Sequence, residues 1–351
     1  MTQRSVDIWN YVVVNSRQQG LSLRLRTLQL QLGATALGTL QGYKAAANKL
    51  MKFLTRQCWR LSSLTANQLA QFAAYSFDVD DNKAETVKTA VTNIRGFLRY
   101  FDIVVADEFD EVSLTLEGIC REEVRPTKQA IPILGIHLAI LEQFFTNHST
   151  QSQFAHQARA ALNVHQLQLM TLFTIGQNAL LRVSELVKLK WSDLTMTQSG
   201  CRISISRSKA NQKGPPEAVV ISNHHGNHTN ASIWINLYIT KCPKTDQNWI
   251  FPNLSKLKLC ITARYVNDVL KQYAPVIGFD PTKVSSHSLR SGGATDLVHF
   301  GCHPNEVSRQ ARWKSLEMVD LYYRPSDVEF ADRLSERYDT RGNYSGYKGT
   351  K

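Results

Sequence analysis

The pattern of apolar and polar residues predicts helices over residues 37–119. In the segment TVKTAVTNIRGFLRYF, apolar residues recur at steps of three and four, which is the period of an amphipathic helix. These residues are Val87, Val91, Ile94 and Leu98. An earlier segment, TANQLAQFAAYSF, opens with Thr65 and has Gln68 three residues later, the pattern of a capping box. We therefore expect a helical domain at 36–120, preceded by an N-terminal extension (1–35) with no clear period.

The segment REEVRPTKQAIP, Arg121 to Pro132, is charged, contains two prolines and has no periodicity. This composition predicts a linker between two domains at 121–132. A chain of 351 residues is long enough for two domains and additional tails.

The second domain, expected at 133–325, combines helices with a small antiparallel β element. The apolar patterns of ILGIHLAILEQFF and VHQLQLMTLFTIGQNALL predict a helix in each segment. CRISISRSK alternates and is rich in β-branched residues, NQKGPP predicts a turn, and EAVVIS predicts the returning strand. Further helices are expected near 230–242, 261–273, 287–300, 304–310 and 315–323. A C-terminal tail at 326–351 begins with one short helix, and the predicted fold class is mainly α with this β hairpin.

Composition narrows the possible partners and compartments. The formal net charge is +12 and the pI is about 9.4, which favours a polyanionic partner, either nucleic acid or an anionic membrane. No apolar run is long enough for a transmembrane helix, and the first residues lack the features of a signal peptide. The 6 cysteines are far apart, which predicts free thiols in a reducing compartment. We therefore expect a protein that is not secreted and has no membrane-spanning helix.

Two sets of basic residues fall on single helix faces. The first set is Lys49, Lys52 and Arg56, and the second is Lys88, Arg95 and Arg99. Such stripes suit contacts to the phosphate backbone of DNA. An ordinary solvated helix face is an equally good interpretation of either stripe alone.

The candidate catalytic residues lie in the second domain. In SSHSLRSGGATDLVHFG, His287 and Arg290 are three residues apart at a predicted helix start, so they can meet one anion. In LLRVSELVKLKW, Arg182 lies among apolar residues and needs a partner, which Glu185 can supply. Each pair alone is also compatible with a solvated helix surface or a weak intrahelical ion pair.

Two further segments add a lysine and a pair of tyrosines. Lys209 ends the first predicted strand, although Lys213 in the same turn competes for any role. Trp313 is followed nine residues later by Tyr322, with Tyr323 next to it. Leu316, Val319 and Tyr323 recur at helical steps and predict a stripe that faces the core. Tyr322 lies about 100° round the helix from Tyr323, which leaves it free to face a site.

The segment NHHGNH contains His224, His225 and His228, which suggests zinc at first sight. Its spacing matches no common set of four ligands, and no cysteine is close in sequence. We therefore expect a loop and no metal site.

Together these segments resemble the tyrosine recombinases, in particular Cre-like members. LLRVSE, SRSK, HSLR and RW followed by LYYR occur in the order of that family over about residues 175–325. The segment HSLRSGGAT is also similar to the corresponding segment in recombinases of eukaryotic cryptons and DIRS-type mobile elements. One departure is Gln310-Ala311-Arg312, which replaces a glycine-containing turn before the tryptophan and leaves the orientation of Trp313 open.

The resemblance implies roles for individual residues. By position, Arg182 and Arg290 correspond to the two arginines, Lys209 to the hairpin lysine and His287 to the histidine of the family. Trp313 takes the position that is His or Trp, and Glu185 corresponds to an acidic residue that supports Arg182. Tyr322 corresponds to the nucleophile, nine residues after the tryptophan.

The resemblance also implies a two-domain, C-shaped clamp around double-stranded DNA and a homotetramer on two DNA sites, with no membrane as a partner. The implied reaction is site-specific recombination or integration through a 3′-phosphotyrosyl intermediate and a Holliday junction. It needs no metal, ATP or other cofactor, and the protein would come from a mobile element or phage. The expected location is the nucleus of a eukaryote or otherwise the cytoplasm. Two alternatives are a catalytically silent DNA-binding relative and a type IB topoisomerase.

Overall fold

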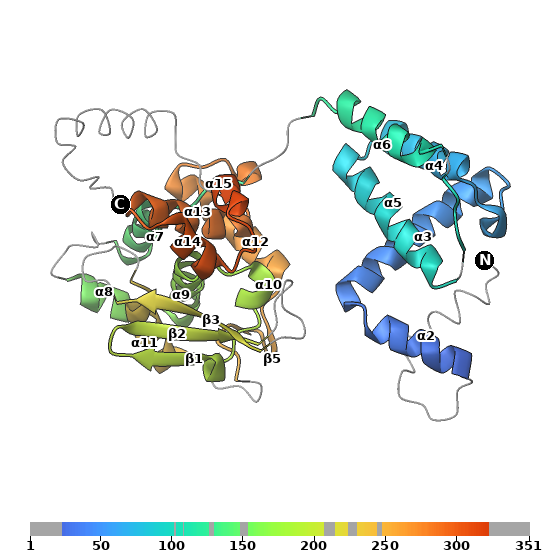
Figure 1. Ribbon diagram of the computed structural model, residues 1–351. Helices are drawn as coiled ribbons and strands as arrows, with labels where there is room; N and C mark the ends of the chain where they lie inside the picture. Colours follow the sequence, from blue (N-terminus) through green and yellow to red (C-terminus); the bar gives the residue numbers. More distant parts are fainter. Residues whose placement is uncertain are drawn as a thin grey trace, which may run out of the picture. The chain divides into compact units, whose positions relative to one another are not determined.

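The computed structural model describes residues 23–101, 103–107, 109–125, 130–147, 154–206, 215–223, 230–243 and 248–322. The chain divides into two compact units, Met1–Thr127 and Lys128–Lys351 (Figure 1). The division falls inside the segment 121–132, for which the sequence predicts a linker. Both units are mainly helical and the second contains a small antiparallel sheet, which confirms the predicted fold class.

The first unit is built from helices around one hydrophobic core. They are α2 (Leu23–Gly33), α3 (Leu37–Arg56), the 3-10 turn η1 (Leu61–Ser63), α4 (Ala66–Asp78), α5 (Ala84–Arg99) and α6 (Glu111–Glu122). The four apolar residues predicted to face the core from α5 are at most 2% exposed, so that prediction is confirmed. The capping box is also confirmed, because Thr65 and Gln68 exchange hydrogen bonds of 3.1 and 3.2 Å.

The second unit packs its helices around α9, which is buried along most of its length. Its helices are α7 (Gly135–Thr146), α8 (Ala155–Ala161), α9 (Val164–Asn178), α10 (Val183–Leu186), α11 (Ala231–Lys241), α12 (Ala263–Tyr273), α13 (Ser286–His299), α14 (Pro304–Ala311) and α15 (Glu317–Tyr322). The described part of this unit also contains the 3-10 turns η2 (Trp191–Asp193), η3 (Ala274–Ile277) and η4 (Pro281–Lys283).

Strands β1 (Leu194–Thr197), β2 (Gly200–Ile205) and β3 (Glu217–Ser222) form an antiparallel sheet in that order (Figure 1). Cys201, Ile203 and Ile205 are at most 5% exposed, so the alternation predicted for the first strand of the hairpin is confirmed. The sequence did not predict β1, nor the small pair β4 (Pro252–Asn253) and β5 (Lys256–Cys260), because these strands bury few side chains. The predicted turn residues Lys209 and Lys213, and all three histidines of NHHGNH, lie outside the described residues.

Two adjacent glycines let α13 approach its neighbours closely. A Cβ atom at Gly292 would lie 1.8 Å from the carbonyl oxygen of Ile133, and one at Gly293 would lie 2.0 Å from that of Gln177. A larger side chain would push α13 away from Ile133 or from α9, because backbone cannot yield as a flexible side chain can. The pair therefore holds the first turns of α13 beside the end of α9.

The carboxylate of Asp296 joins three helices of this unit. It accepts hydrogen bonds from the backbone nitrogen of Gly135 at 2.8 Å and from Nε2 of Gln177 at 2.6 Å. These contacts connect α13 with the start of α7 and the end of α9. Burial raises the pKa of Asp296 to about 6, although the two hydrogen bonds oppose the rise.

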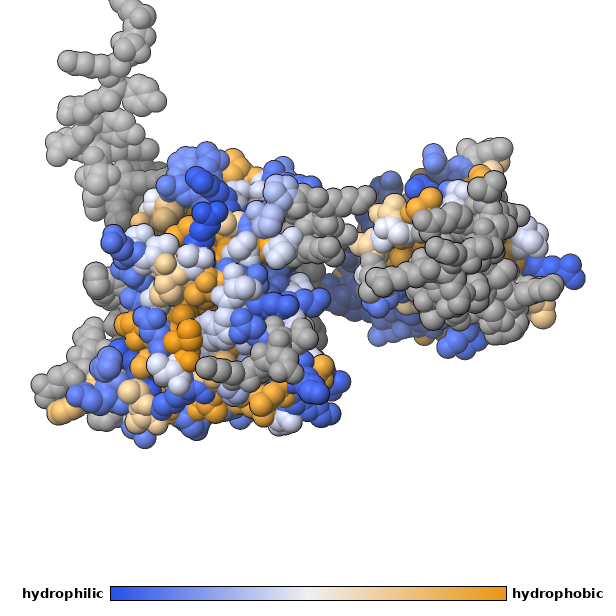
Figure 2. Space-filling view, turned by 90° about the horizontal axis from the view of Figure 1, so that it is seen from below, coloured by the Kyte–Doolittle hydropathy of each residue, from blue (hydrophilic) through white to orange (hydrophobic). Residues whose placement is uncertain are grey.

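On the face seen in Figure 2, hydrophobic side chains are exposed among hydrophilic ones. Among the described helices, none is both long and apolar enough to cross a bilayer. All 6 cysteines belong to the described residues and are unpaired.

We expect Asp296→Asn to change how stability depends on pH. Because the pKa of Asp296 is raised from 3.8 to about 6, the folded state binds more protons than the unfolded state in this window. The free energy of unfolding contributed by this group therefore falls as pH rises from about 4 to 6, by at most about 3 kcal/mol. Asparagine keeps an acceptor oxygen but does not titrate, so urea denaturation of this variant should lack that fall.

The matched control is Asp268→Asn, which removes a carboxylate that is 63% exposed on α12. Its stability should follow the wild-type pH dependence. If the free energies of unfolding of the wild type and Asp296→Asn changed in parallel with pH, the raised pKa of Asp296 would be contradicted.

Candidate active site

The carboxylate of Glu185 lies between two arginines. Arg182 precedes α10, and its Nη1 donates to Oε1 of Glu185 at 2.9 Å. Oε2 of Glu185 accepts from the backbone nitrogen of Arg182 at 2.9 Å and from Nη2 of Arg312 at 2.6 Å. The Glu185 side chain is buried, whereas that of Arg182 is 24% exposed. Glu185 thus fixes an arginine that can still reach an external anion.

Arg290 is held beneath the surface by backbone oxygens from two other elements. It is 1% exposed, and its Nη1 and Nη2 donate to the carbonyl groups of Leu180 and Ala311 respectively. Leu180 itself has a left-handed backbone (φ 49°), an unusual conformation for a buried leucine. These bonds place the guanidinium where the end of α9 and the end of α14 meet.

Trp313 covers Arg290, with its ring centroid 5.4 Å from the guanidinium carbon. The tryptophan also packs against a small apolar cluster of the same unit. The buried members are Leu180, Ala294, Val307, Ala311 and Val319. The unusual segment before Trp313 therefore leaves the ring beside Arg290, which answers the question that the sequence left open.

His287 lies at the surface in the first turn of α13. Partial desolvation lowers the pKa of its imidazole below the ordinary 6.5, and the positive charges of Arg290 and Arg182 lower it further. The three-residue step thus brings His287 and Arg290 together, but only His287 is exposed. At neutral pH the imidazole is uncharged, so it can donate or accept one hydrogen bond.

The structure describes the backbone of Tyr322, at the end of α15, but not its side chain, and Tyr323 lies outside the described residues. The predicted core stripe is wrong at one position: Val319 is 3% exposed, but Leu316 is 49% exposed. Leu316 precedes the first residue of α15, so a helical period does not apply to it. The nine-residue step from Trp313 remains as the argument for Tyr322.

The residues of the two basic stripes differ in how available their charges are for a phosphate. Lys49, Lys52, Lys88 and Arg99 are exposed. Arg56 is also exposed but donates to the hydroxyl of Tyr75, and Arg95 forms an ion pair with Asp107 at 2.8 Å. Arg95 is therefore less available for a phosphate than the lysines.

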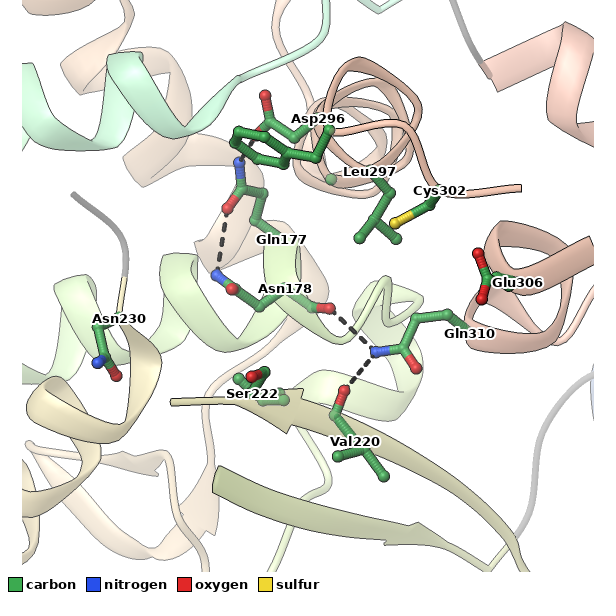
Figure 3. A pocket seen from close by; sticks show the side chains of 13 residues that line it. Gln177, Asn178, Val220, Ser222, Asn230, Asp296, Leu297, Cys302, Glu306 and Gln310 are labelled. Atoms are coloured by element: carbon green, nitrogen blue, oxygen red, sulfur yellow. Dashed lines mark hydrogen bonds between the residues drawn. The ribbon is translucent and has the colours of Figure 1, made fainter. Parts of the chain in front are cut away.

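A cavity of about 580 Å³ reaches Gln310, two residues before Arg312, and several of the side chains that line it are polar (Figure 3). Asp296 accepts from Gln177, whose Oε1 accepts from Asn178 at 3.2 Å. Nε2 of Gln310 donates to the carbonyl oxygens of Asn178 at 3.2 Å and Val220 at 2.7 Å. These hydrogen bonds fix the end of α14, immediately before Trp313, to α9 and β3.

Arg312 also belongs to this site, although the sequence analysis assigned it no role of its own. The signal was available, because an arginine occupies the segment where the resemblance predicts a glycine-containing turn. Its ion pairs with Glu185 and Glu217 could not be read from the sequence, since these residues are far away along the chain. Within the described part of the chain, no group of three His, Cys, Asp or Glu side chains is placed to bind a metal.

Comparison with known proteins places this arrangement in a family. The model of the phage integrase family matches residues 145–329. Tyrosine recombinase XerD from Proteus mirabilis is 24% identical over 330 residues, which cover 91% of this chain and 92% of that protein. An integrase/recombinase XerD homolog from Selenomonas ruminantium is 27% identical over 175 residues, 48% of this chain and 50% of that protein.

The fold agrees with this assignment. The crystal structure of the XerH site-specific recombinase bound to palindromic difH substrate, a post-cleavage complex, has a TM-score of 0.61 and 15% identity. The match covers 96% of this chain and 94% of that one. Since the family model spans more than half of the sequence, the resemblance is confirmed, and the chain belongs to the phage integrase family of tyrosine recombinases.

Proposed function

We propose that this chain is a site-specific DNA recombinase or integrase that joins strands through a 3′-phosphotyrosyl intermediate and a Holliday junction. The observation that carries the proposal is the cluster of Arg182, His287, Arg290 and Trp313 around one surface site. Three of these four side chains can act on a phosphodiester with little rearrangement, because only Arg290 is fully buried.

In the proposed reaction, the hydroxyl oxygen of Tyr322 attacks the phosphorus atom and forms a new O–P bond. The bond from phosphorus to the 5′-oxygen breaks, and Lys209 gives a proton to that leaving oxygen. A 5′-hydroxyl of the partner duplex then attacks the phosphotyrosine and releases Tyr322. Because each step exchanges one phosphodiester for another, the reaction needs no ATP. It needs no metal ion, because the arginines and Lys209 supply the positive charge.

The charged residues suit the transition state of this exchange. Negative charge gathers on the non-bridging oxygens, and Arg182 can offer its forked donors to them. Arg290 adds a second positive charge beneath Trp313, whose indole N–H is a neutral donor. His287, neutral at pH 7, can hydrogen-bond a phosphate oxygen or relay the proton of the tyrosine.

The proposed partner is double-stranded DNA, bound by a homotetramer that joins two sites. The net charge of +12 and the exposed lysines of α3 and α5 support DNA as the partner. The related XerH structure was solved with a DNA substrate. A homotetramer follows from the need to bring four cleavage sites together on two duplexes.

The nucleophile is tested with a suicide DNA substrate, built from repeats that flank the coding sequence. Wild type and Tyr323→Phe should form an SDS-resistant covalent adduct, because both retain the attacking hydroxyl. Tyr322→Phe should reduce adduct formation by at least about a thousandfold.

Three results would change the proposal. An adduct formed by Tyr322→Phe would refute the assignment of the nucleophile. DNA binding by the wild type with no adduct would identify a catalytically silent relative. Relaxation of supercoiled plasmids that lack the site would instead favour topoisomerase activity.

His287 should titrate below pH 6.5 in the DNA-free protein, since desolvation and two arginines oppose its protonation. NMR titration of the imidazole measures this midpoint. Arg182→Ala should raise the midpoint toward the ordinary value, because one positive charge is removed. The control Arg264→Gln removes a charge of the same unit whose side chain is 91% exposed and therefore screened by water, and should leave the midpoint nearly unchanged. A wild-type midpoint at or above 6.5 would contradict the described site.

Lys88 and Arg95 offer a matched test of the DNA-binding stripe on α5. Lys88→Gln should weaken binding and reduce the slope of log affinity against log salt concentration by about 0.9, as expected for one lost phosphate contact. Arg95→Gln should change the slope less, because its guanidinium is paired with Asp107 at 2.8 Å. Fluorescence anisotropy at several salt concentrations gives both slopes. Equal changes, or none for Lys88→Gln, would exclude this stripe as a phosphate contact.

A further inference from the structure

Arg312 combines burial with an unusual backbone. It follows α14 in the left-handed conformation (φ 56°), which glycine adopts without steric cost but other residues rarely do. Its side chain is nevertheless only 5% exposed. A residue that served only to turn the chain here would be better replaced by glycine, so the side chain itself needs an explanation.

The guanidinium of Arg312 contacts two carboxylates from different parts of the unit. Nη2 donates to Oε2 of Glu185 at 2.6 Å, and Nε lies 3.6 Å from Oε2 of Glu217, the first residue of β3. Burial lowers the pKa of this guanidinium, whereas the charge of Glu185 opposes that shift. Arginine stays protonated even so, which makes it suited to a buried ion pair.

Glu185 connects Arg312 with Arg182. Its other oxygen accepts from Nη1 of Arg182 at 2.9 Å, so the three side chains form a continuous series, Arg312–Glu185–Arg182. Without Arg312, one oxygen of a buried carboxylate would keep only the backbone nitrogen of Arg182 as a partner among the described residues. The carboxylate would then be free to turn, and Arg182 with it.

The residues next to Arg312 fix the same segment. The carbonyl oxygen of Ala311 accepts from Arg290 at 2.5 Å, and Gln310 donates to Val220 of β3 (Figure 3). The segment 310–312 thus contacts one arginine of the site directly and the other through Glu185. A glycine-containing turn could supply the backbone bond to Arg290 but not the contact with Glu185.

We propose that Arg312 is a positioning residue of the strand-transfer reaction, which orients Arg182 through Glu185 and does not touch the DNA. The proposal rests on the function proposed above. It differs from a purely structural role, because the effect of Arg312 on catalysis must disappear when Glu185 is changed.

The test is a double-mutant cycle with Arg312→Gly and Glu185→Gln. Arg312→Gly suits the left-handed backbone, so thermal unfolding should show a folded protein. At saturating suicide substrate, its cleavage rate should fall about ten- to hundredfold. The double variant should cleave no more slowly than Glu185→Gln alone, and Arg312→Lys should recover part of the rate. The control Arg309→Ala removes an exposed charge from the same helix and should stay within about twofold of wild type.

Either of two kinetic results would overturn the proposal. A wild-type cleavage rate for Arg312→Gly would show that catalysis does not need the Arg312 side chain. Multiplied losses in the double variant would show that Arg312 acts independently of Glu185.

A crystal structure of Arg312→Gly supplies a measurement that does not depend on catalysis. We expect the side chain of Arg182 to leave its 2.9 Å contact with Glu185, while Arg290 keeps its bond to Leu180. An unchanged Arg182 would refute the positioning role. If the wild type forms no adduct with any DNA, the proposed function fails, and this structure still decides whether Arg312 positions Arg182.

Discussion

The buried carboxylate of Glu185 is the contact on which the site depends. It joins residues that belong to separate segments, because Arg182 precedes α10 and Arg312 follows α14. A buried carboxylate is unfavourable unless its oxygens are fully paired, so the three side chains stabilise one another only as a set. The orientation of Arg182, a partly exposed arginine, is thereby set by contacts inside the protein, where water competes little.

The site also depends on the close approach of α13 to the backbone of its neighbours. Gly292 and Gly293 remove side chains that would collide with the backbone at Ile133 and Gln177. The resulting packing brings the start of α13 next to the end of α9, and so places Arg290 within reach of Leu180. The glycines in the segment HSLRSGGAT are therefore a packing requirement of the site, in addition to the histidine and arginine that mark its chemistry.

Local features were predictable from the sequence to a large extent. The capping box at Thr65, the apolar face of α5 and the alternation of β2 were all correct, because each depends on neighbours within a few residues. The family and fold class were also correct, since the order of the motifs carries that information. The prediction was wrong at Leu316, where a helical period was extended beyond the start of α15.

Long-range contacts of charged groups were not predictable. The sequence paired Glu185 with Arg182, but nothing local indicates that Arg312, more than a hundred residues later, shares the same carboxylate. The burial of Arg290 was missed for the same reason. Its acceptors are backbone carbonyls, which every residue carries, so they leave no signal in the amino-acid sequence.

The burial of Arg290 has an energetic consequence. A guanidinium that is 1% exposed has already lost its hydration shell when the chain folds. The free energy of dehydrating this charge is incurred during folding, so it does not add to the barrier of a reaction at the site. Burying a charge lowers the stability of the fold, since contacts inside the protein, among them two backbone carbonyls and the ring of Trp313, must replace its hydration. In this protein, a less stable fold and a preorganised site are two results of one buried side chain.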